Sequence, residues 1–72
     1  MYMEVLVFAT NVNTPQEIEL LRPLLDLLPG INRWNFDLDD CDRVLRIEGP
    51  VDLANTVRET LYEKGFVCSE LA

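Results

Sequence analysis

The feature that most restricts the fold is the order in which hydrophobic periods follow one another along the chain. Residues 3–10 alternate and are rich in Val, Leu and Phe, which predicts a half-buried strand. Residues 14–28 then carry apolar side chains at helical spacing, and residues 31–39 and 43–48 alternate again on either side of a polar turn. A second helical stripe precedes Gly65, and a short strand over residues 66–71 completes the sequence. The predicted order is therefore strand, helix, strand, strand, helix, strand.

Local signals at the start of the first helix support this order. Thr14 suits the N-cap, Pro15 suits the first helical position, and Glu17 completes a capping box three residues after the cap. Pro23 lies inside the helix and predicts a kink, because proline deletes one backbone hydrogen bond. We expect the helix to end at Pro29-Gly30. Its core-facing stripe consists of Ile18, Leu21, Leu25 and Leu28.

The second helix is predicted between Asp52, which can cap it, and Gly65, which stops it. The connections between neighbouring elements are short, which suits an α+β domain whose helices pack on one face of an antiparallel sheet. The order of elements predicts a ferredoxin-like βαββαβ sandwich, with a four-stranded antiparallel sheet and two helices on one face. With 72 residues, the chain is expected to form a single domain over positions 1–72.

Composition removes several classes of function. A net charge of -7 repels phosphate backbones and anionic membranes, so we expect no nucleic acid and no membrane among the partners. The apolar run over residues 5–9 is too short to span a bilayer and follows no basic segment, which favours a cytoplasmic protein. The sequence has no histidine, no glycine-rich phosphate loop and no nucleophile placed beside a base by a motif. We therefore expect no enzyme activity and no cofactor.

Particular residues narrow the fold to one family resemblance. The stripe of the first helix runs into Pro29, Gly30 and Ile31, and a second helix over residues 52–65 is followed by Phe66. At this spacing the chain resembles heavy-metal-associated domains, which are found in copper chaperones and in the N-terminal modules of metal-transporting ATPases. The resemblance covers nearly all 72 residues. It implies the same ferredoxin-like fold and, for typical members, a Cys-x-x-Cys metal site before the first helix.

That metal site is degenerate in this sequence. Counting back from Gly30 by the family spacing places the two ligand cysteines at Thr14 and Glu17. A hydroxyl and a carboxylate are hard ligands, whereas Cu(I) and zinc sites of this kind need soft thiolates. The family's metal ligands therefore do not carry over, and we expect no bound metal ion. We interpret Thr14 and Glu17 as a structural cap, with a reused hard-metal or anion site as the alternative.

Other polar residues have a structural interpretation beside a functional one. Cys41 is expected in the hairpin turn at the same end as residues 10–14, where it is either a surrogate metal ligand or an incidental thiol. The acidic residues around it lack the glycine and terminal glutamate of a calcium loop, which favours a solvated turn. Cys68, Trp34 and Phe36 are expected in the core. The acidic residues around Cys41, which we expect in the solvated turn, are Asp37, Asp39, Asp40 and Asp42.

The parity of the first strand predicts an exposed apolar surface. If Val5, Val7 and Ala9 face the helices, then Leu6 and Phe8 face outward, because side chains alternate along a strand. Side chains of the third and fourth strands are expected on the same open face, and they complete the predicted interaction surface: Val44, Arg46, Val67 and Leu71. Leu20, Leu24 and Leu27 form a second candidate surface on the first helix.

The sequence thus predicts a non-catalytic domain with a degenerate metal site that acts in protein–protein interaction or self-association. The expected partner is another protein or a second copy of the chain. The alternative is a diverged metal carrier with Thr14, Glu17 and Cys41 as ligands. A small-molecule-binding regulatory domain is a third hypothesis, for which the sequence carries no motif.

Overall fold

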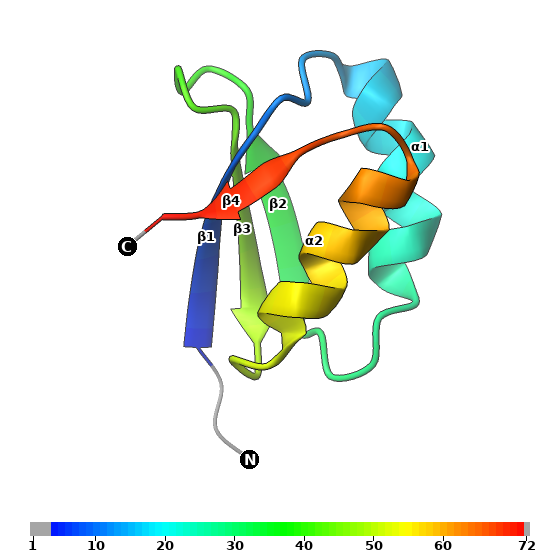
Figure 1. The fold of residues 1–72 in the computed structure, drawn as a ribbon, viewed down its shortest axis with the longest axis vertical. Coiled ribbons are helices and arrows are strands. Elements are labelled where there is room, and N and C mark those ends of the chain that lie inside the picture. Colours follow the sequence, from blue (N-terminus) through cyan, green and yellow to red (C-terminus); the bar gives the residue numbers. More distant parts are fainter. Residues whose placement is uncertain (1–3, 72) are drawn as a thin grey trace.

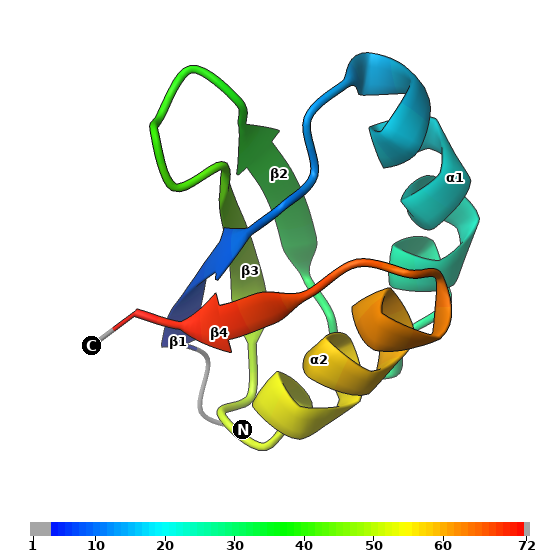
Figure 2. The ribbon, with the colours of Figure 1, turned by 45° about the horizontal axis from the view of Figure 1, so that its top comes forward.

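The computed structural model describes residues 4–71 and confirms the predicted order of elements. The elements are β1 (Glu4–Thr10), α1 (Pro15–Asp26), β2 (Arg33–Asp37), β3 (Val44–Gly49), α2 (Leu53–Glu63) and β4 (Cys68–Glu70). The strands form one antiparallel sheet in the order β2-β3-β1-β4, and both helices lie on one side of it (Figures 1 and 2). This is the ferredoxin-like βαββαβ sandwich expected from the sequence. Met3 and Ala72 lie outside the described residues.

Helix α1 begins where the sequence predicted and ends earlier. Thr14 is the N-cap and Pro15 the first helical residue, but the C-cap is Leu27. The amide of Leu28 donates to the Leu25 carbonyl over 3.2 Å, an i to i−3 bond that tightens the last turn. The helix continues past Pro23 to Asp26, and the chain turns at Gly30, whose φ of +85° favours glycine.

Strands β2 and β4 are shorter than predicted, and the second helix is capped differently. Strand β2 covers residues 33–37 instead of 31–39, and β4 covers residues 68–70 instead of 66–71. Asp52 occupies the N-cap position of α2 but makes no side-chain capping bond. The Leu53 amide instead donates to the Pro50 carbonyl over 3.0 Å. Gly65, with φ of +90°, ends α2 as predicted.

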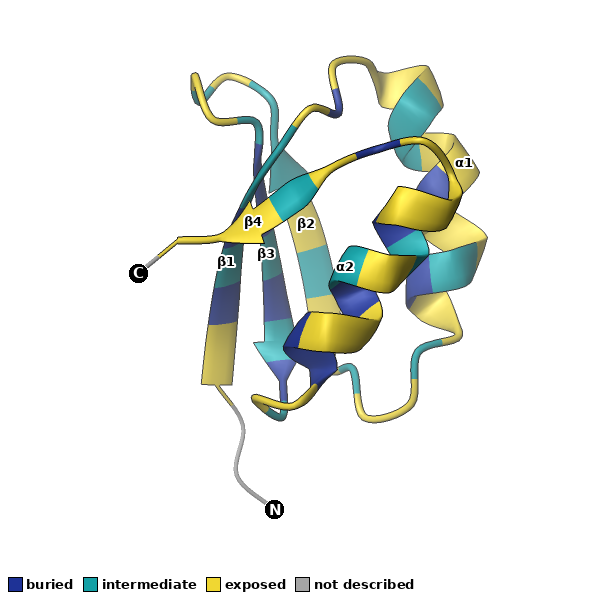
Figure 3. Cartoon of the chain, in the orientation of Figure 1, coloured by how far each residue is buried: buried dark blue, intermediate teal, exposed yellow. Residues whose placement is uncertain are grey.

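The core lies between the helices and the inner face of β1 and β3 (Figure 3). Leu21 and Leu25 of α1 are fully buried, whereas Ile18 and Leu28 are partly buried at the ends of the same stripe. Trp34 and Phe36, which were expected in the core, face it but are only partly buried, because β2 is an edge strand. The remaining fully enclosed side chains come from both layers and the loop before α1: Phe8, Val12, Leu45, Ile47, Val57 and Leu61.

The predicted orientation of β1 is wrong. Leu6 is 5% exposed and Phe8 is completely buried, whereas Val5 is 58% exposed. Leu6 pairs with Ile47 and Phe8 with Leu45 across the β1–β3 ladder, and paired residues share a face of the sheet. Because the inward direction of β3 is unambiguous, the register places Leu6 and Phe8 under the helices.

Candidate functional site

The loop before α1, at the end of the molecule where the resemblance places a metal site, is closed by its own capping box. The Glu17 amide donates to Thr14 Oγ1 over 3.1 Å, and Glu17 Oε1 accepts from the amides of Asn13 and Thr14 over 2.7 and 3.2 Å. The carboxylate therefore occupies two backbone donors at the positive end of the helix dipole. Thr14 and Glu17 lie together as predicted, and Thr14 Oγ1 and Glu17 Oε1 both accept hydrogen bonds from the backbone.

Arg43 forms a second closure of this loop that the sequence did not reveal. Its Nε donates to Asn13 Oδ1 over 3.0 Å, and its Nη1 donates to the carbonyls of Leu38 and Asp40 over 3.4 Å. The Arg43 carbonyl in turn accepts from Thr10 Oγ1 over 2.6 Å. The Arg43 backbone has φ of +48°, a conformation uncommon outside glycine and asparagine. A guanidinium thus bridges the β2–β3 hairpin and the loop before α1.

These contacts give the loop a chemistry that opposes cation binding. Thr14 Oγ1 and Glu17 Oε1 already accept backbone hydrogen bonds, and the permanently charged Arg43 donates to Asn13 Oδ1. A soft metal would find no thiolate at positions 14 and 17. A hard cation would have to compete with existing hydrogen bonds while being repelled by the guanidinium.

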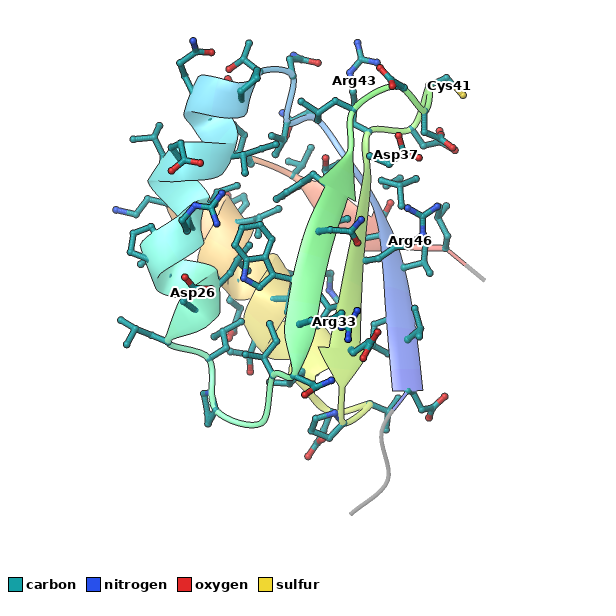
Figure 4. The ribbon with its side chains drawn as sticks, turned by 180° about the vertical axis from the view of Figure 1, so that it is seen from behind. Asp26, Arg33, Asp37, Cys41, Arg43 and Arg46 are labelled. Carbon is teal, nitrogen blue, oxygen red and sulfur yellow. The ribbon has the colours of Figure 1, made fainter. Side chains whose placement is uncertain are left out.

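Cys41 lies at the tip of the β2–β3 hairpin, where Figure 4 shows its sulfur pointing away from the sheet. Ligand atoms of Asp40, Cys41 and Asp42 lie within 4.8 Å of one another, which is close enough for a metal ion in distance alone. Asp40 Oδ1, however, accepts from the Asp42 amide over 2.9 Å and so forms part of the turn itself. Exposed thiol and carboxylate groups at a loop tip do not by themselves define a metal site.

The open face of the sheet differs in composition from the predicted interaction surface. Leu6 and Phe8 are replaced there by Val5, Val7 and Ala9, whose partners across the ladders also point away from the helices. Arg46 pairs with Val7, and Leu71 donates to the Val7 carbonyl over 2.8 Å, so both lie on this face as predicted.

Val44 belongs to the open face by its pairing with Asp37, and Val67, which precedes β4, lies opposite Asn11 on the same face. Val67 is 57% exposed and Leu71 is 39% exposed, but Val44 is buried and offers no surface for contact. We define the apolar patch as the exposed or partly exposed apolar residues on the β1–β4 half of this face: Val5, Val7, Ala9, Val67 and Leu71.

The other half of the open face, over β2 and β3, is polar and balanced in charge. Arg33 pairs with Glu48 at 3.4 Å, and Arg46 pairs with Asp37 at 3.8 Å. Such exposed pairs contribute little to stability, but they leave this half of the face electrically neutral within a chain of net charge -7. Figure 4 shows Arg33, Asp37 and Arg46 along these two strands.

The predicted helix surface is divided between the core and solvent. Leu20 and Leu27 are exposed, whereas Leu24 packs against the core. Only two of its three leucines are therefore available, and they are seven residues apart in sequence.

A groove of about 580 Å³ between α1 and the edge strand β2 was not foreseen. Trp34 lies in it, with its indole Nε1 donating to Asp26 Oδ1 over 2.8 Å. The Arg22 guanidinium lies 5.3 Å from the Trp34 ring centroid, and Phe36 meets the indole edge-on at 6.0 Å. A partly buried indole N–H needs a hydrogen-bond acceptor. This need was the one sequence signal for a contact between Trp34 and a polar residue of α1.

Three ionisable groups among the described residues have a shifted pKa, and the hydrogen bond to Glu19 raises the pKa of one of them, Arg22. Burial raises the pKa of the Cys68 thiol, and the Arg58 cation opposes this in part. The hydrogen bond from Arg22 lowers the pKa of the Glu19 carboxyl. Cys68 is packed against the core as predicted, and both described cysteines are free thiols. No helix within residues 4–71 has the length and apolarity needed to cross a bilayer.

Comparison with known proteins supports the fold. No protein-family model matches the chain, and no curated protein is significantly similar in sequence. Among solved structures, the oxidised form of MerP from Ralstonia metallidurans CH34 superposes with a TM-score of 0.80 over 99% of this chain and 100% of MerP. The sequence identity is 5%, so the likeness establishes a shared fold and carries no ligand residue from one protein to the other.

Proposed function

We propose that this domain is a metal-free interaction module with a heavy-metal-associated-like fold, which binds protein through its sheet instead of carrying a metal ion. The observation that carries the proposal is the closed loop before α1. Thr14 and Glu17 stabilise the helix start, and Arg43 lies where a bound cation would be repelled. The loop thus supports the shape of the domain without offering soft ligands.

The apolar patch on the open face supports a role in binding. Val5 and Val67 are more than half exposed, although they belong to or adjoin a central and an edge strand of the sheet. Helices cover only the opposite face, so the patch has no cover within residues 4–71 (Figure 2). Apolar side chains gathered on one uncovered face mark interaction sites more often than scattered single residues do. The neutral, ion-paired half beside it avoids the repulsion that the net negative charge would otherwise impose on an acidic partner.

Co-purification with matched variants tests this role. We expect a protein bound to the wild-type domain in native extract to be lost from a Val5→Glu, Leu71→Glu double variant. Val51→Glu is the control, because Val51 is similarly exposed but lies in the loop before α2. Equal binding by the double variant and the control would contradict docking on the open face. Loss with Leu20→Glu alone would assign binding to α1 instead.

A diverged metal carrier is the second candidate function. Its support is the fold shared with MerP together with the grouping of Asp40, Cys41 and Asp42 at the hairpin tip. This alternative predicts that zinc or Cu(I) binds with a stoichiometry of one and that Cys41→Ser abolishes binding. Calorimetric titration of the wild type and Cys41→Ser separates it from the metal-free proposal.

A further inference from the structure

Strand β2 is an edge of the sheet whose free side is available for pairing. The strand order places β2 next to β3 alone, and it contains neither proline nor glycine in its five residues. Natural edge strands are usually protected by proline, bulges, inward charges or a covering segment. None of the first three devices interrupts residues 33–37.

The pairing of β1 with β3 and β4, and of β2 with β3, determines which way the N–H and C=O groups of each β2 residue point. Val7 and Asn11 exchange hydrogen bonds with the β4 side, so the even-numbered residues of β1 bond to β3. Residues 45, 47 and 49 of β3 therefore face β1, which leaves residues 44, 46 and 48 to face β2. Their partners in β2 are residues 37, 35 and 33. The backbone N–H and C=O groups of Trp34 and Phe36 consequently point to the free edge, where no strand lies within residues 4–71.

The sequence of β2 is complementary to itself when it is reversed. Antiparallel pairing of two β2 strands about Asn35 sets Arg33 opposite Asp37 of the second copy, and Asp37 opposite the second Arg33. Trp34 then faces the second Phe36, and Asn35 faces its own equivalent. Opposite charges and aromatic pairs directly across two strands are the favourable combinations. In this register the hydrogen-bonded pairs are those of residues 34 and 36, the residues whose backbone groups are free.

The groove beside α1 provides room for the second strand. It is open to solvent and runs along β2, with Trp34, Asn35 and Phe36 among its lining residues. Trp34 and Phe36 point to the helix side, so an incoming aromatic side chain of the same parity enters the groove beside the indole. Figure 4 shows β2 as the strand nearest α1, with Arg33 and Asp37 towards its two ends.

We infer that two copies of this chain associate through antiparallel β2 strands centred on Asn35, giving a continuous eight-stranded sheet. A twofold axis perpendicular to the sheet keeps both helical layers on one side and both open faces on the other. The inference deepens the proposed function, because it names a second copy as one protein partner and sets two apolar patches on one surface. It uses a different surface from the apolar patch.

Charge variants at the twofold axis test the register. Asn35 is exposed and meets its equivalent across the axis, so Asn35→Asp and Asn35→Lys each set two like charges opposite one another. We expect the wild type to form a dimer of 8.3 kDa chains by sedimentation velocity, and each variant to raise the dimer Kd by about fivefold or more. An equimolar mixture of the two variants restores association, because the charges across the axis are then opposite.

Matched controls separate the effect of a charge at the paired β2 strands from the effect of changing the net charge of the chain. Ser69→Asp and Ser69→Lys change the same charges on β4, at the other edge of the sheet, and leave the dimer Kd unchanged. Thermal unfolding of the Asn35 variants confirms that the monomer remains folded. Native mass spectrometry with one variant isotopically labelled identifies the mixed species as a heterodimer.

A wild-type chain that stays monomeric at millimolar concentration overturns the inference. So does a dimer that both Asn35 variants leave intact, or a mixture without heterodimers. Loss of partner binding in the Val5→Glu, Leu71→Glu variant with an intact dimer would support the open-face function independently. A dimer that responds only to that double variant would retain the interaction module and reject pairing through β2.

Discussion

Removal of the Thr14 hydroxyl tests whether the closed loop is a structural cap. The hydroxyl oxygen accepts from the Glu17 amide over 3.1 Å, and loss of such an N-cap acceptor costs about 0.5 to 2 kcal/mol. Both groups are exposed, so water replaces part of the lost bond and we expect Thr14→Ala to lower the free energy of unfolding by about 1 kcal/mol. For a domain of this size, that corresponds to a fall in Tm of about 4 to 8 °C.

The assay is urea and thermal unfolding of Thr14→Ala, Thr14→Ser, Glu17→Ala and the Thr14→Ala, Glu17→Ala double variant. Thr14→Ser keeps the acceptor and should retain most of the stability. The double variant should lose less than the sum of the single losses, because the two side chains belong to one hydrogen-bonded unit. Identical stability of Thr14→Ala and Thr14→Ser would refute the capping interpretation. A stabilising shift with added zinc that disappears in both single variants would refute it as well.

Three further predictions follow from the burial of individual side chains. Phe8→Ala should destabilise the domain by about 3 to 5 kcal/mol in denaturant unfolding, whereas Val5→Ala should change stability by less than about 0.5 kcal/mol; equal losses would contradict the orientation of β1. Because burial raises the pKa of the Cys68 thiol, Cys41 should react faster with a disulfide reagent near neutral pH, and the measured rates in Cys41→Ser and Cys68→Ser decide this. A folded-state pKa above the unfolded one also means that stability is lost as the pH rises through the raised value, and Cys68→Ser should remove that loss.

Local signals in the sequence predicted the order of elements and the capping box, because both depend on residues close together in the chain. The orientation of β1 could not be obtained in this way. The odd-numbered and the even-numbered residues between Val5 and Ala9 are all apolar, so the sequence pattern does not show which set faces the helices. The pairing of Leu6 with Ile47 decides it. Strand β3 has alternating polar and apolar residues, and its direction was predicted correctly.

In the candidate site too, the contacts between residues close in sequence were predicted and the contacts between distant residues were not. The interaction between Thr14 and Glu17 spans three residues and was predicted, whereas Arg43 reaches Asn13 across 30 residues. Nothing in the local sequence around Arg43 indicated a positive φ or a contact with the loop before α1. The five residues of β2 are self-complementary in sequence. This complementarity predicts pairing between two copies only because the topology shows that β2 is an edge strand.

Competition for Cu(I) with a coloured chelator of micromolar affinity tests the central claim most directly. The claim is that the loop closed by Thr14, Glu17 and Arg43 supports the fold and does not hold a soft metal. We predict that the chelator retains all of the copper in the presence of the wild-type domain and of Cys41→Ser alike. Withdrawal of one Cu(I) per chain by the wild type, abolished by Thr14→Ala or Glu17→Ala, would contradict the account.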